Sequence, residues 1–403
     1  MSNPLSLLPF AMAAGGGRID DAPAAALVAA GFALLQRSAP IVRALAGRRS
    51  GILLPSSGAY LTALAASDGR GAVLLNPSAE RDELSFQLDD ADVGVVFTSR
   101  ALSGRIQSTD RPIVLLDDAP RRATVIVDGK ETHIDLGSHF GLELAGEVDV
   151  GRDEDCVIAY TAASTGTPLG AALTHRNLLA NARGAVDALS LHAGDHLLAL
   201  FPFADLFGFT VAMAAPTLAG ARVSTASGEH PSTTLDRIAG GDVSILVGDP
   251  ATYAALIAGL EQRAAPWVAP ALRVCVCGGA QLPVAIQDRW FELTGSELRQ
   301  GYSLAEAAPL CLFNPPHFPN RRGTLGIPFP GVEVTIRDPD SGVAQPQGTE
   351  GALCVRGPNV FRGYLRGGER GRQLRDGWLY TGDRGCERSD GTFELRGHAG
   401  ESD

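Results

Sequence analysis

The hydrophobic pattern of the first part of the chain alternates between strand and helix periods. Strand patterns lie at residues 50–55, 71–77 and 93–97, and helical patterns at 22–47, 57–66 and 80–88. Strands that alternate with short helices indicate βαβ units, which form a mostly parallel sheet covered on both faces. We therefore predict an α/β lobe over residues 1–150.

The same alternation resumes after a polar stretch at 120–150. Strand patterns lie at 155–160, 198–203, 243–247 and 274–277, and helical patterns at 178–182, 209–218 and 252–260. From Gly323 onward, short alternating segments separated by Gly, Pro and Asp turns are typical of an antiparallel, barrel-like lobe. We expect a second α/β lobe at 151–320 and a small β-rich lobe at 321–396, since 403 residues exceed one core.

Composition and charge narrow the function classes. The chain holds 34 Lys and Arg against 45 Asp and Glu, a net charge of −11. This acidity argues against nucleic-acid binding, which requires a concentrated basic surface. The longest apolar run, Ala24 to Leu35, is too short to cross a bilayer and predicts a buried helix. Because the first 17 residues also lack the positive segment of a signal peptide, we expect a cytoplasmic protein without a transmembrane segment.

The cysteines predict no metal site. The six of them lie mostly in apolar, strand-like contexts. Cys275 and Cys277 form a C-x-C pair, but no second Cys/His pair stands at zinc spacing. We predict buried free thiols.

The stretch Tyr160–Gly170 (YTAASTGTPLG) follows an apolar strand and precedes the helix that Thr174 or Asn177 can cap. Small residues let backbone N–H groups approach phosphate oxygens, so a loop of this kind suits a polyanion. The spacing is not that of a Walker loop. On its own, the stretch is also compatible with an ordinary Ser/Thr/Gly surface loop.

This stretch resembles the phosphate loop of the acyl-adenylate-forming superfamily, which includes acyl-CoA synthetases, peptide-synthetase adenylation domains and luciferases. The family loop runs Y-T-S-G-S-T-G-x-P-K-G, and seven of its ten specified positions match here. The resemblance implies a catalytic role for Thr161 and nucleotide contacts at Ser164, Thr165 and Gly166. Leu169 replaces the family lysine, and Ala162-Ala163 replaces Ser-Gly.

Phe201–Gly208 (FPFADLFG) resembles the family stretch L-P-x-F-H-x-F-G, which borders the acyl pocket. The resemblance places Phe203 and Asp205 at that pocket. Asp205 stands where the family usually has His, and two interpretations stay open. Its carboxylate either caps the helix that begins near Gly208 or pairs with a substrate amino group, as in the amino-acid-activating branch.

Two further stretches resemble the family's adenine and metal motifs. Cys275–Pro283 (CVCGGAQLP) is similar to C-V-S-G-G-A-P-L-P, which implies that Gly278, Gly279 and Ala280 line the acyl pocket and approach adenine. Gln300–Glu306 (QGYSLAE) resembles Q-G-Y-G-x-T-E. By that likeness Gly301 and Tyr302 contact adenine and Glu306 holds Mg²⁺, a hard cation that prefers oxygen ligands. The motif's threonine is replaced by Ala305.

The end of the chain carries two more likenesses. Asp376–Gly385 (DGWLYTGDRG) matches D-G-W-x-x-T-G-D-x-G, in which Asp383 would accept hydrogen bonds from both ribose hydroxyls. Residues 397–403 correspond to the family's hinge, with His398 in place of an arginine that contacts phosphate and ribose. In the family a small lysine-bearing domain follows, and the chain stops before it.

The resemblance implies an AMP-forming ligase in which a carboxylate attacks the α-phosphorus of ATP, giving acyl-AMP and pyrophosphate. Coenzyme A or the phosphopantetheine of an acyl carrier protein would then accept the acyl group. Phosphoryl transfer depends on Mg²⁺ and cationic donors, and several family donors are replaced here. The alternative is therefore an impaired or reassigned relative that binds an adenylate, an acyl ligand or a partner without turnover. A homodimer and a separately supplied C-terminal domain also stay open.

Overall fold

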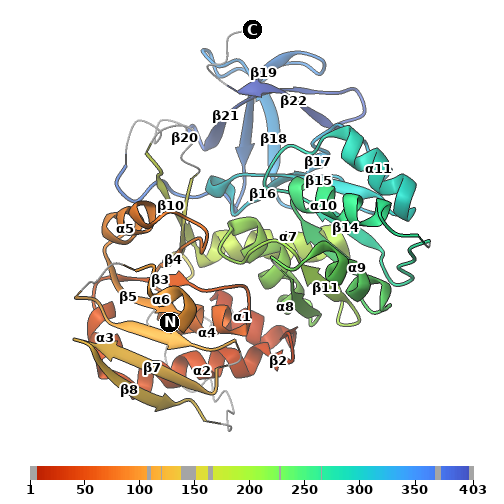
Figure 1. Cartoon of the computed structure of the whole chain (residues 1–403). Coiled ribbons are helices and arrows are strands. Elements are labelled where there is room, and N and C mark those ends of the chain that lie inside the picture. The colour runs from red at the N-terminus through yellow and green to blue at the C-terminus, as the bar shows by residue number, and fades with distance from the viewer. Residues whose placement is uncertain are drawn as a thin grey trace.

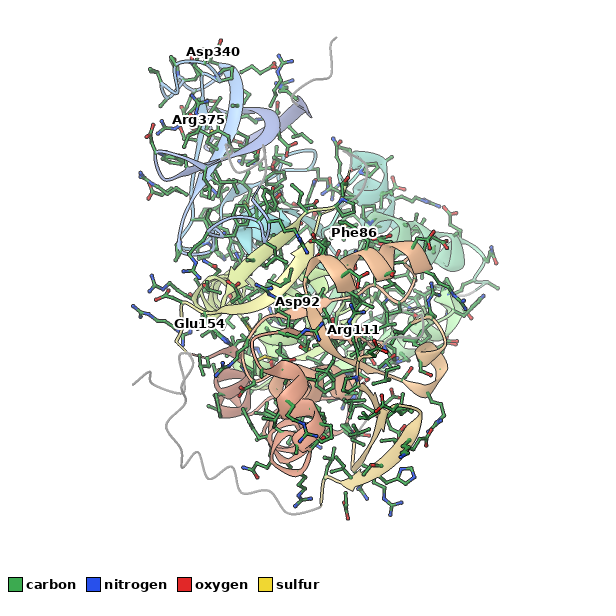
Figure 2. All side chains as sticks on the ribbon, turned by 90° about the vertical axis from the view of Figure 1, so that its left-hand side faces the viewer. Phe86, Asp92, Arg111, Glu154, Asp340 and Arg375 are labelled. Atoms are coloured by element: carbon green, nitrogen blue, oxygen red, sulfur yellow. The ribbon has the colours of Figure 1, made fainter. Side chains whose placement is uncertain are left out.

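The structure is a computed structural model that describes residues 7–106, 110–118, 120–137, 151–161, 167–226, 228–264, 266–367 and 374–398. Two α/β lobes lie side by side, and a β-rich lobe stands above them (Figure 1). Figure 2 shows Asp340 and Arg375 on that upper lobe, away from Phe86 on the first. The predicted fold class, two mostly parallel α/β lobes followed by an antiparallel β lobe, is confirmed.

The first sheet has eight strands in the order β10-β9-β4-β3-β5-β6-β7-β8. Their bounds are β3 (Arg49–Leu53), β4 (Ala72–Leu74), β5 (Val93–Thr98), β6 (Ile113–Leu116), β7 (Arg122–Val127), β8 (Lys130–Asp135), β9 (Asp155–Tyr160) and β10 (Gly170–Thr174). The inner strands pair in parallel, while β10, β7 and β8 add antiparallel pairs at the edges. Three helices follow strands of this sheet: α4 (Gly58–Ala66), α5 (Arg81–Asp90) and α6 (Arg100–Ser103).

The second sheet has nine strands in the order β17-β16-β15-β14-β13-β11-β12-β1-β2. Their bounds are β1 (Arg18–Ile19), β2 (Ala22–Pro23), β11 (His196–Ala199), β12 (Arg222–Thr225), β13 (Ile245–Gly248), β14 (Val274–Cys277), β15 (Leu298–Ser303), β16 (Leu310–Phe313) and β17 (Ile327–Pro328). The helices α9 (Pro231–Ala239), α10 (Pro250–Glu261) and α11 (Val284–Thr294) belong to this lobe. Apolar strands such as β14 are buried along their whole length, as expected for a sheet covered on both faces.

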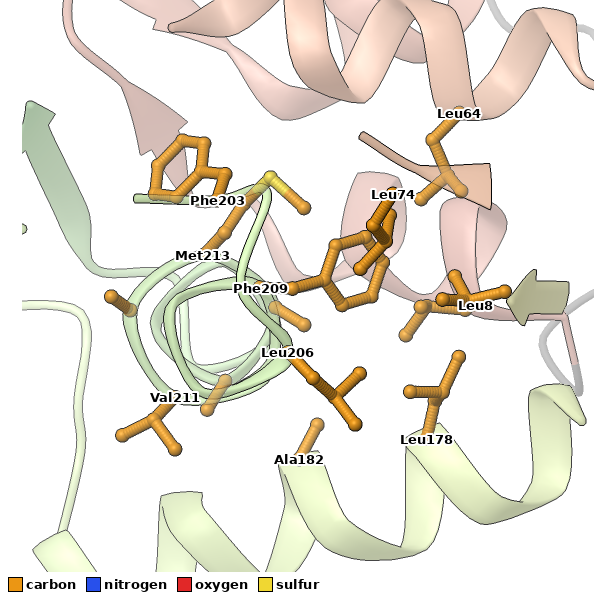
Figure 3. Close-up of a cluster of buried hydrophobic side chains, with 14 of the residues drawn as sticks. Leu8, Leu64, Leu74, Leu178, Ala182, Phe203, Leu206, Phe209, Val211 and Met213 are labelled. Atoms are coloured by element: carbon orange, nitrogen blue, oxygen red, sulfur yellow. The ribbon is translucent and has the colours of Figure 1, made fainter. Parts of the chain in front are cut away.

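The core between the sheets is helical. It contains α1 (Leu8–Gly15), α2 (Ala24–Arg37), α7 (His175–Leu189), the π-helix η3 (Gly208–Ala214) and α8 (Ala215–Leu218), with α3 (Ala39–Leu45) after α2. Figure 3 shows η3 end-on, between Leu178 and Ala182 of α7 on one side and Leu64 and Leu74 on the other. Helix α7 begins as the sequence predicts, because Thr174 and Asn177 form a reciprocal capping box.

The third lobe is a five-stranded antiparallel sheet made of β18 (Glu333–Arg337), β19 (Glu350–Arg356), β20 (Leu374–Arg375), β21 (Trp378–Glu387) and β22 (Phe393–His398). The Trp378 ring lies between the guanidinium groups of Arg337 and Arg356, 4.4 and 4.3 Å from its centroid. Such cation–π contacts fix the ring on the sheet surface. They therefore hold the strand that carries Asp383.

The structure adds detail to the sequence predictions. The helix expected at 209–218 is a π-helix followed by one α-helical turn, and the polar stretch at 120–150 contains the β7–β8 hairpin. The domain boundary at 150 stays a prediction, and the sheets exchange strands across it: β9 and β10 complete the first sheet, β1 and β2 the second. All six cysteines are buried free thiols, as predicted. Among the described helices no single one is long and apolar enough to span a membrane; α2 and α3, bent by 94° at their junction, meet that test only together.

Candidate active site

A cavity of about 360 Å³ lies where the carboxyl ends of strands from both α/β lobes meet. Its wall takes Asn76 from the end of β4, Thr161 from the end of β9 and Ser303 from β15, together with Asp205 from the turn before η3. Ligands of open α/β sheets bind outside the carboxyl ends of the strands, so the fold itself points to this cavity.

Both ends of the stretch that was predicted to hold phosphate are described, and Thr161 at its start lines this cavity. Thr161 and Leu169 close the base of this stretch: the Thr161 N–H donates to the Leu169 carbonyl at 3.0 Å, and the Leu169 N–H donates to the Thr161 hydroxyl at 3.1 Å. Within the described part of the chain no hydrogen bond uses the Thr161 hydroxyl proton. Leu169 packs against the apolar core and offers no charge. Ser164, Thr165 and Gly166 lie outside the described residues.

Glu306, the predicted metal ligand, lies on the short 3₁₀-helix η4 (Ala305–Ala307), just beyond the cavity wall. Its carboxylate accepts a hydrogen bond from the Tyr364 hydroxyl, and its carbonyl accepts the Phe361 N–H at 2.9 Å. Asn359, buried in the same segment, donates to the Ala307 carbonyl at 2.7 Å. The segment between β19 and β20 therefore fixes Glu306. Tyr364 was missed from the sequence because a tyrosine in an irregular segment carries no signal of its partner.

Tyr302 and Asp383 lie far apart in the sequence but meet in the structure. The Tyr302 hydroxyl, at the end of β15, donates to a carboxylate oxygen of Asp383 in β21. Both residues are buried, and burial raises the pKa of Tyr302 well above its ordinary value, so the hydroxyl stays a donor. The Asp383 N–H donates to the Thr381 hydroxyl at 3.1 Å. His398 of β22 stands opposite Asp383 of β21 in the antiparallel sheet. The side chain of His398 is not among the described parts of the structure.

Asp205 lines the cavity and also performs the capping role that the sequence left open. Its carboxylate accepts the Phe207 N–H at 2.7 Å at the start of η3. Desolvation by the surrounding protein raises the pKa of Asp205. The hydrogen bonds from the N–H groups of Phe207 and Gly208 lower the pKa, but their effect is smaller. The side chain is exposed to the cavity, so the carboxylate can cap the helix and face a ligand at once.

Residues 44–365 match the model of the family described as AMP-binding enzyme. The chain belongs to this family.

The relatives to which the chain is similar include proteins named as CoA ligases or synthases. A long-chain-fatty-acid–CoA ligase of Bacillus subtilis (strain 168) is 28% identical over 350 residues, covering 80% of this chain and 62% of that protein. A feruloyl-CoA synthase of Amycolatopsis sp. is 29% identical over 351 residues, covering 87% and 68%. The chain therefore spans under two thirds of the first relative's length.

Solved structures of the AMP-binding family confirm the fold. The anthranilate CoA ligase AuaEII, in complex with anthranoyl-AMP, superposes with a TM-score of 0.80 at 21% identity. The match covers 98% of this chain and 78% of that chain. The family match over residues 44–365 confirms the resemblance that the sequence motifs indicated.

The glycines of the family's acyl-pocket motif have aromatic neighbours here. A Cβ on Gly278 would stand 2.2 Å from the Phe207 ring, and one on Gly279 would stand 2.6 Å from the Phe201 ring. Gly301 likewise faces Leu310, at 2.7 Å. Gly279 and Ala280 are exposed, and Gly279 lines the cavity.

Phe203, predicted at the pocket, is fully buried in the core beside the Tyr60 ring, 6.0 Å away (Figure 3). It does not line the described cavity, where Phe207 supplies the aromatic wall instead. Its backbone N–H donates to the Ser56 hydroxyl at 2.9 Å. Phe203 therefore acts on the site through the position of the turn that carries Asp205.

The described oxygen groups fit a nucleotide with a divalent cation. Glu306 is a carboxylate beside the cavity, and Asp383 offers an acceptor suited to a diol. The described cavity wall contains the acids Glu83 and Asp205 but no lysine or arginine. Phosphate charge in this cavity would therefore fall to a bound cation and to backbone N–H groups.

Proposed function

We propose that this chain is the nucleotide-binding part of an AMP-forming ligase that activates a carboxylic acid. The carboxylate oxygen would attack the α-phosphorus of ATP, a P–O bond would form, and pyrophosphate would leave. A thiol, either coenzyme A or the phosphopantetheine of a carrier protein, would then displace AMP from the acyl carbon. The observation that carries the proposal is that Thr161 and Ser303 line one cavity, while Glu306 directly follows the lining residue Ala305 and Asp383 is hydrogen-bonded to Tyr302, the neighbour of Ser303.

Each residue has a role in this proposal. Asp383 would accept the ribose hydroxyls, exchanging its bond to Tyr302 for bonds to the sugar. Glu306, held by Tyr364, would ligate Mg²⁺, which supplies charge neutralisation at the phosphates. The Thr161 hydroxyl, already an acceptor for Leu169, would donate to a phosphate oxygen. Ser164, Thr165, Gly166 and His398 keep their predicted nucleotide contacts as part of the proposal.

The second candidate function is nucleotide binding without efficient turnover. It is favoured by Leu169, which packs in the core where a lysine would reach a phosphate, and by Ala305 in place of a hydroxyl. Loss of one such donor costs roughly 10²–10³ in rate. Binding and turnover therefore have to be measured separately.

Isothermal calorimetry with ATP and Mg²⁺, repeated with AMP, tests the nucleotide site. Asp383→Ala should abolish the binding heat, and Asp383→Asn, which keeps the shape, guards against a folding defect. Asp340→Ala is the matched control, since it removes the same charge from the same lobe at an exposed position whose carboxylate makes no hydrogen bond within the described chain.

Pyrophosphate release with a panel of carboxylic acids then separates the two functions. Release that depends on acid and Mg²⁺ supports the ligase. Nucleotide binding that is lost in Asp383→Ala, without release from any acid, supports the binding function. No binding by a folded wild-type chain would refute both.

A further inference from the structure

A second cavity of about 310 Å³ lies beside the first, at the carboxyl ends of β3, β4, β11 and β12. The two cavities share Asn76 as a lining residue. Asn76 is exposed, and its side-chain amide oxygen Oδ1 accepts the Ser78 N–H at 2.8 Å. This hydrogen bond fixes the orientation of the Asn76 side chain. Asn76 therefore belongs to the wall that is common to the two cavities.

Aromatic rings back the glycine turn of the first cavity. Behind Gly278 and Gly279 stand the rings of Phe207 and Phe201, at distances that leave no room even for a methyl group. These two rings also pack on each other, with centroids 5.4 Å apart. A substrate whose carboxylate lies near Thr161 thus meets an aromatic wall on the glycine side and space on the Asn76 side.

The second cavity has a distinct chemistry. Pro55, Pro77 and Pro202 give it rigid apolar walls, while Ser56, Ser78 and Thr225 add hydroxyls. No charged side chain occurs among its described lining residues. Such a wall suits an aliphatic chain that ends in an uncharged hydrogen-bonding group, and burying an ionised group there would be costly.

We propose that the second cavity holds the far end of the acyl substrate, and that this end is an uncharged polar group such as a hydroxyl. The inference rests on the proposed function, because the first cavity must hold the carboxylate. The acyl chain then runs past Asn76 toward the first sheet, away from the Gly278 turn. Ser78, which lines only the second cavity of the two, becomes a specificity-determining position.

The test fills the second cavity and leaves the first unchanged. The hydroxyl of Ser78 makes no hydrogen bond to the described part of the chain and the residue is exposed, so Ser78→Trp removes no side-chain interaction of the described fold. Ser78→Ala removes the hydroxyl but keeps the space, so it separates the effect of lost volume from the effect of one lost hydroxyl. The affinities of butanoate and ω-hydroxydecanoate are measured by calorimetry, without nucleotide and with AMP.

We expect wild type and Ser78→Ala to bind ω-hydroxydecanoate more tightly than butanoate. Ser78→Trp should weaken ω-hydroxydecanoate by about tenfold or more, since each displaced methylene lowers affinity several-fold. Butanoate should change by less than about twofold, which lies within the context dependence of such contacts. Equal losses for both acids, or no preference for the longer acid in wild type, would overturn the proposal.

A second variant covers the case in which tryptophan prevents folding. Ser78→Cys introduces one exposed thiol into a chain whose six native cysteines are buried. The new thiol can therefore be modified selectively after folding. A benzyl disulfide adduct should reproduce the selective loss, and a methyl disulfide adduct should not. Pyrophosphate release with the same acids is measured in parallel. If the binding of the two acids changes as expected but no pyrophosphate is released, the ligase function fails while the cavity assignment stands. If pyrophosphate is released but the two adducts affect the binding of the longer acid equally, the cavity assignment fails.

Discussion

The buried imidazole of His175 should make the stability of this protein depend on pH. His175 begins α7, is fully buried, and joins three parts of the core. Its Nδ1 accepts the Leu8 N–H at 3.1 Å, and its Nε2 lies 3.2 Å from the Gly69 carbonyl. Both bonds require the neutral ring with the proton on Nε2. Burial lowers the pKa of His175 from 6.5 to about 4, although the hydrogen bond to the Gly69 carbonyl by itself would raise it.

The size of the effect follows from linkage. The folded pKa lies below the unfolded one, so this stability is complete above pH 6.5 and is lost as pH falls toward about 4. A shift of this size corresponds to about 3 kcal/mol in total, at about 1.4 kcal/mol per pH unit. Roughly 2 kcal/mol of it should be gone at about pH 5.

Urea unfolding of the wild type and of His175→Asn, followed between about pH 7 and about pH 5, measures this term. The asparagine side chain in the variant cannot titrate, and its carbonyl oxygen can still accept from Leu8. The variant should be less stable near neutral pH but lose about 2 kcal/mol less on acidification, because all other titrating groups are common to both proteins. Parallel curves for the two proteins would refute the assignment.

Two further substitutions test a close contact at the glycine turn and a buried ion pair elsewhere in the second lobe. Gly278→Ala should lower the free energy of unfolding by about 1–3 kcal/mol, because the added methyl group would overlap the Phe207 ring. In the control Gly104→Ala the methyl group faces open space, so the urea midpoint should change little. Equal midpoints for the two variants would contradict the steric argument. Asp195→Ala should lower the free energy of unfolding by about 3 kcal/mol, because Asp195 is almost fully buried and receives two hydrogen bonds from the Arg273 guanidinium. Asp195→Asn should recover part of that loss in the same urea measurement. An unchanged stability of Asp195→Ala would count against a stabilising pair.

Local sequence patterns predicted the parts of the fold that local physics decides. The helix cap, for which the sequence offered Thr174 or Asn177, and the strand at 274–277 depend on residues close in the sequence, and both were predicted. The β7–β8 hairpin was not, because its strands lie at a sheet edge with mixed polar faces and carry little periodic signal. The π-helix was also hidden, since its residues are apolar on all sides and fit any helical period.

The candidate site divides in the same way. Glu306 and Asp383 could be found from motifs, because their chemistry depends on spacing within short segments. Their partners could not: Tyr364 lies 58 residues from Glu306, and Tyr302 lies 81 residues from Asp383. Such pairings are set by how the β-rich lobe docks on the second sheet.

These pairings bear on whether the chain binds nucleotide or also turns it over. Tyr302 and Tyr364 satisfy the two carboxylates that the proposed ligand would use, so binding has to exchange these hydrogen bonds for bonds to ribose and cation. The net gain from such an exchange is modest for each bond, and Leu169 supplies no additional attraction for phosphate. Affinity would then come mainly from the metal and from the acyl group. On this argument a chain with the acyl group bound should take up nucleotide more tightly than one without, which makes the second cavity as important to the reaction as the polar groups of the first.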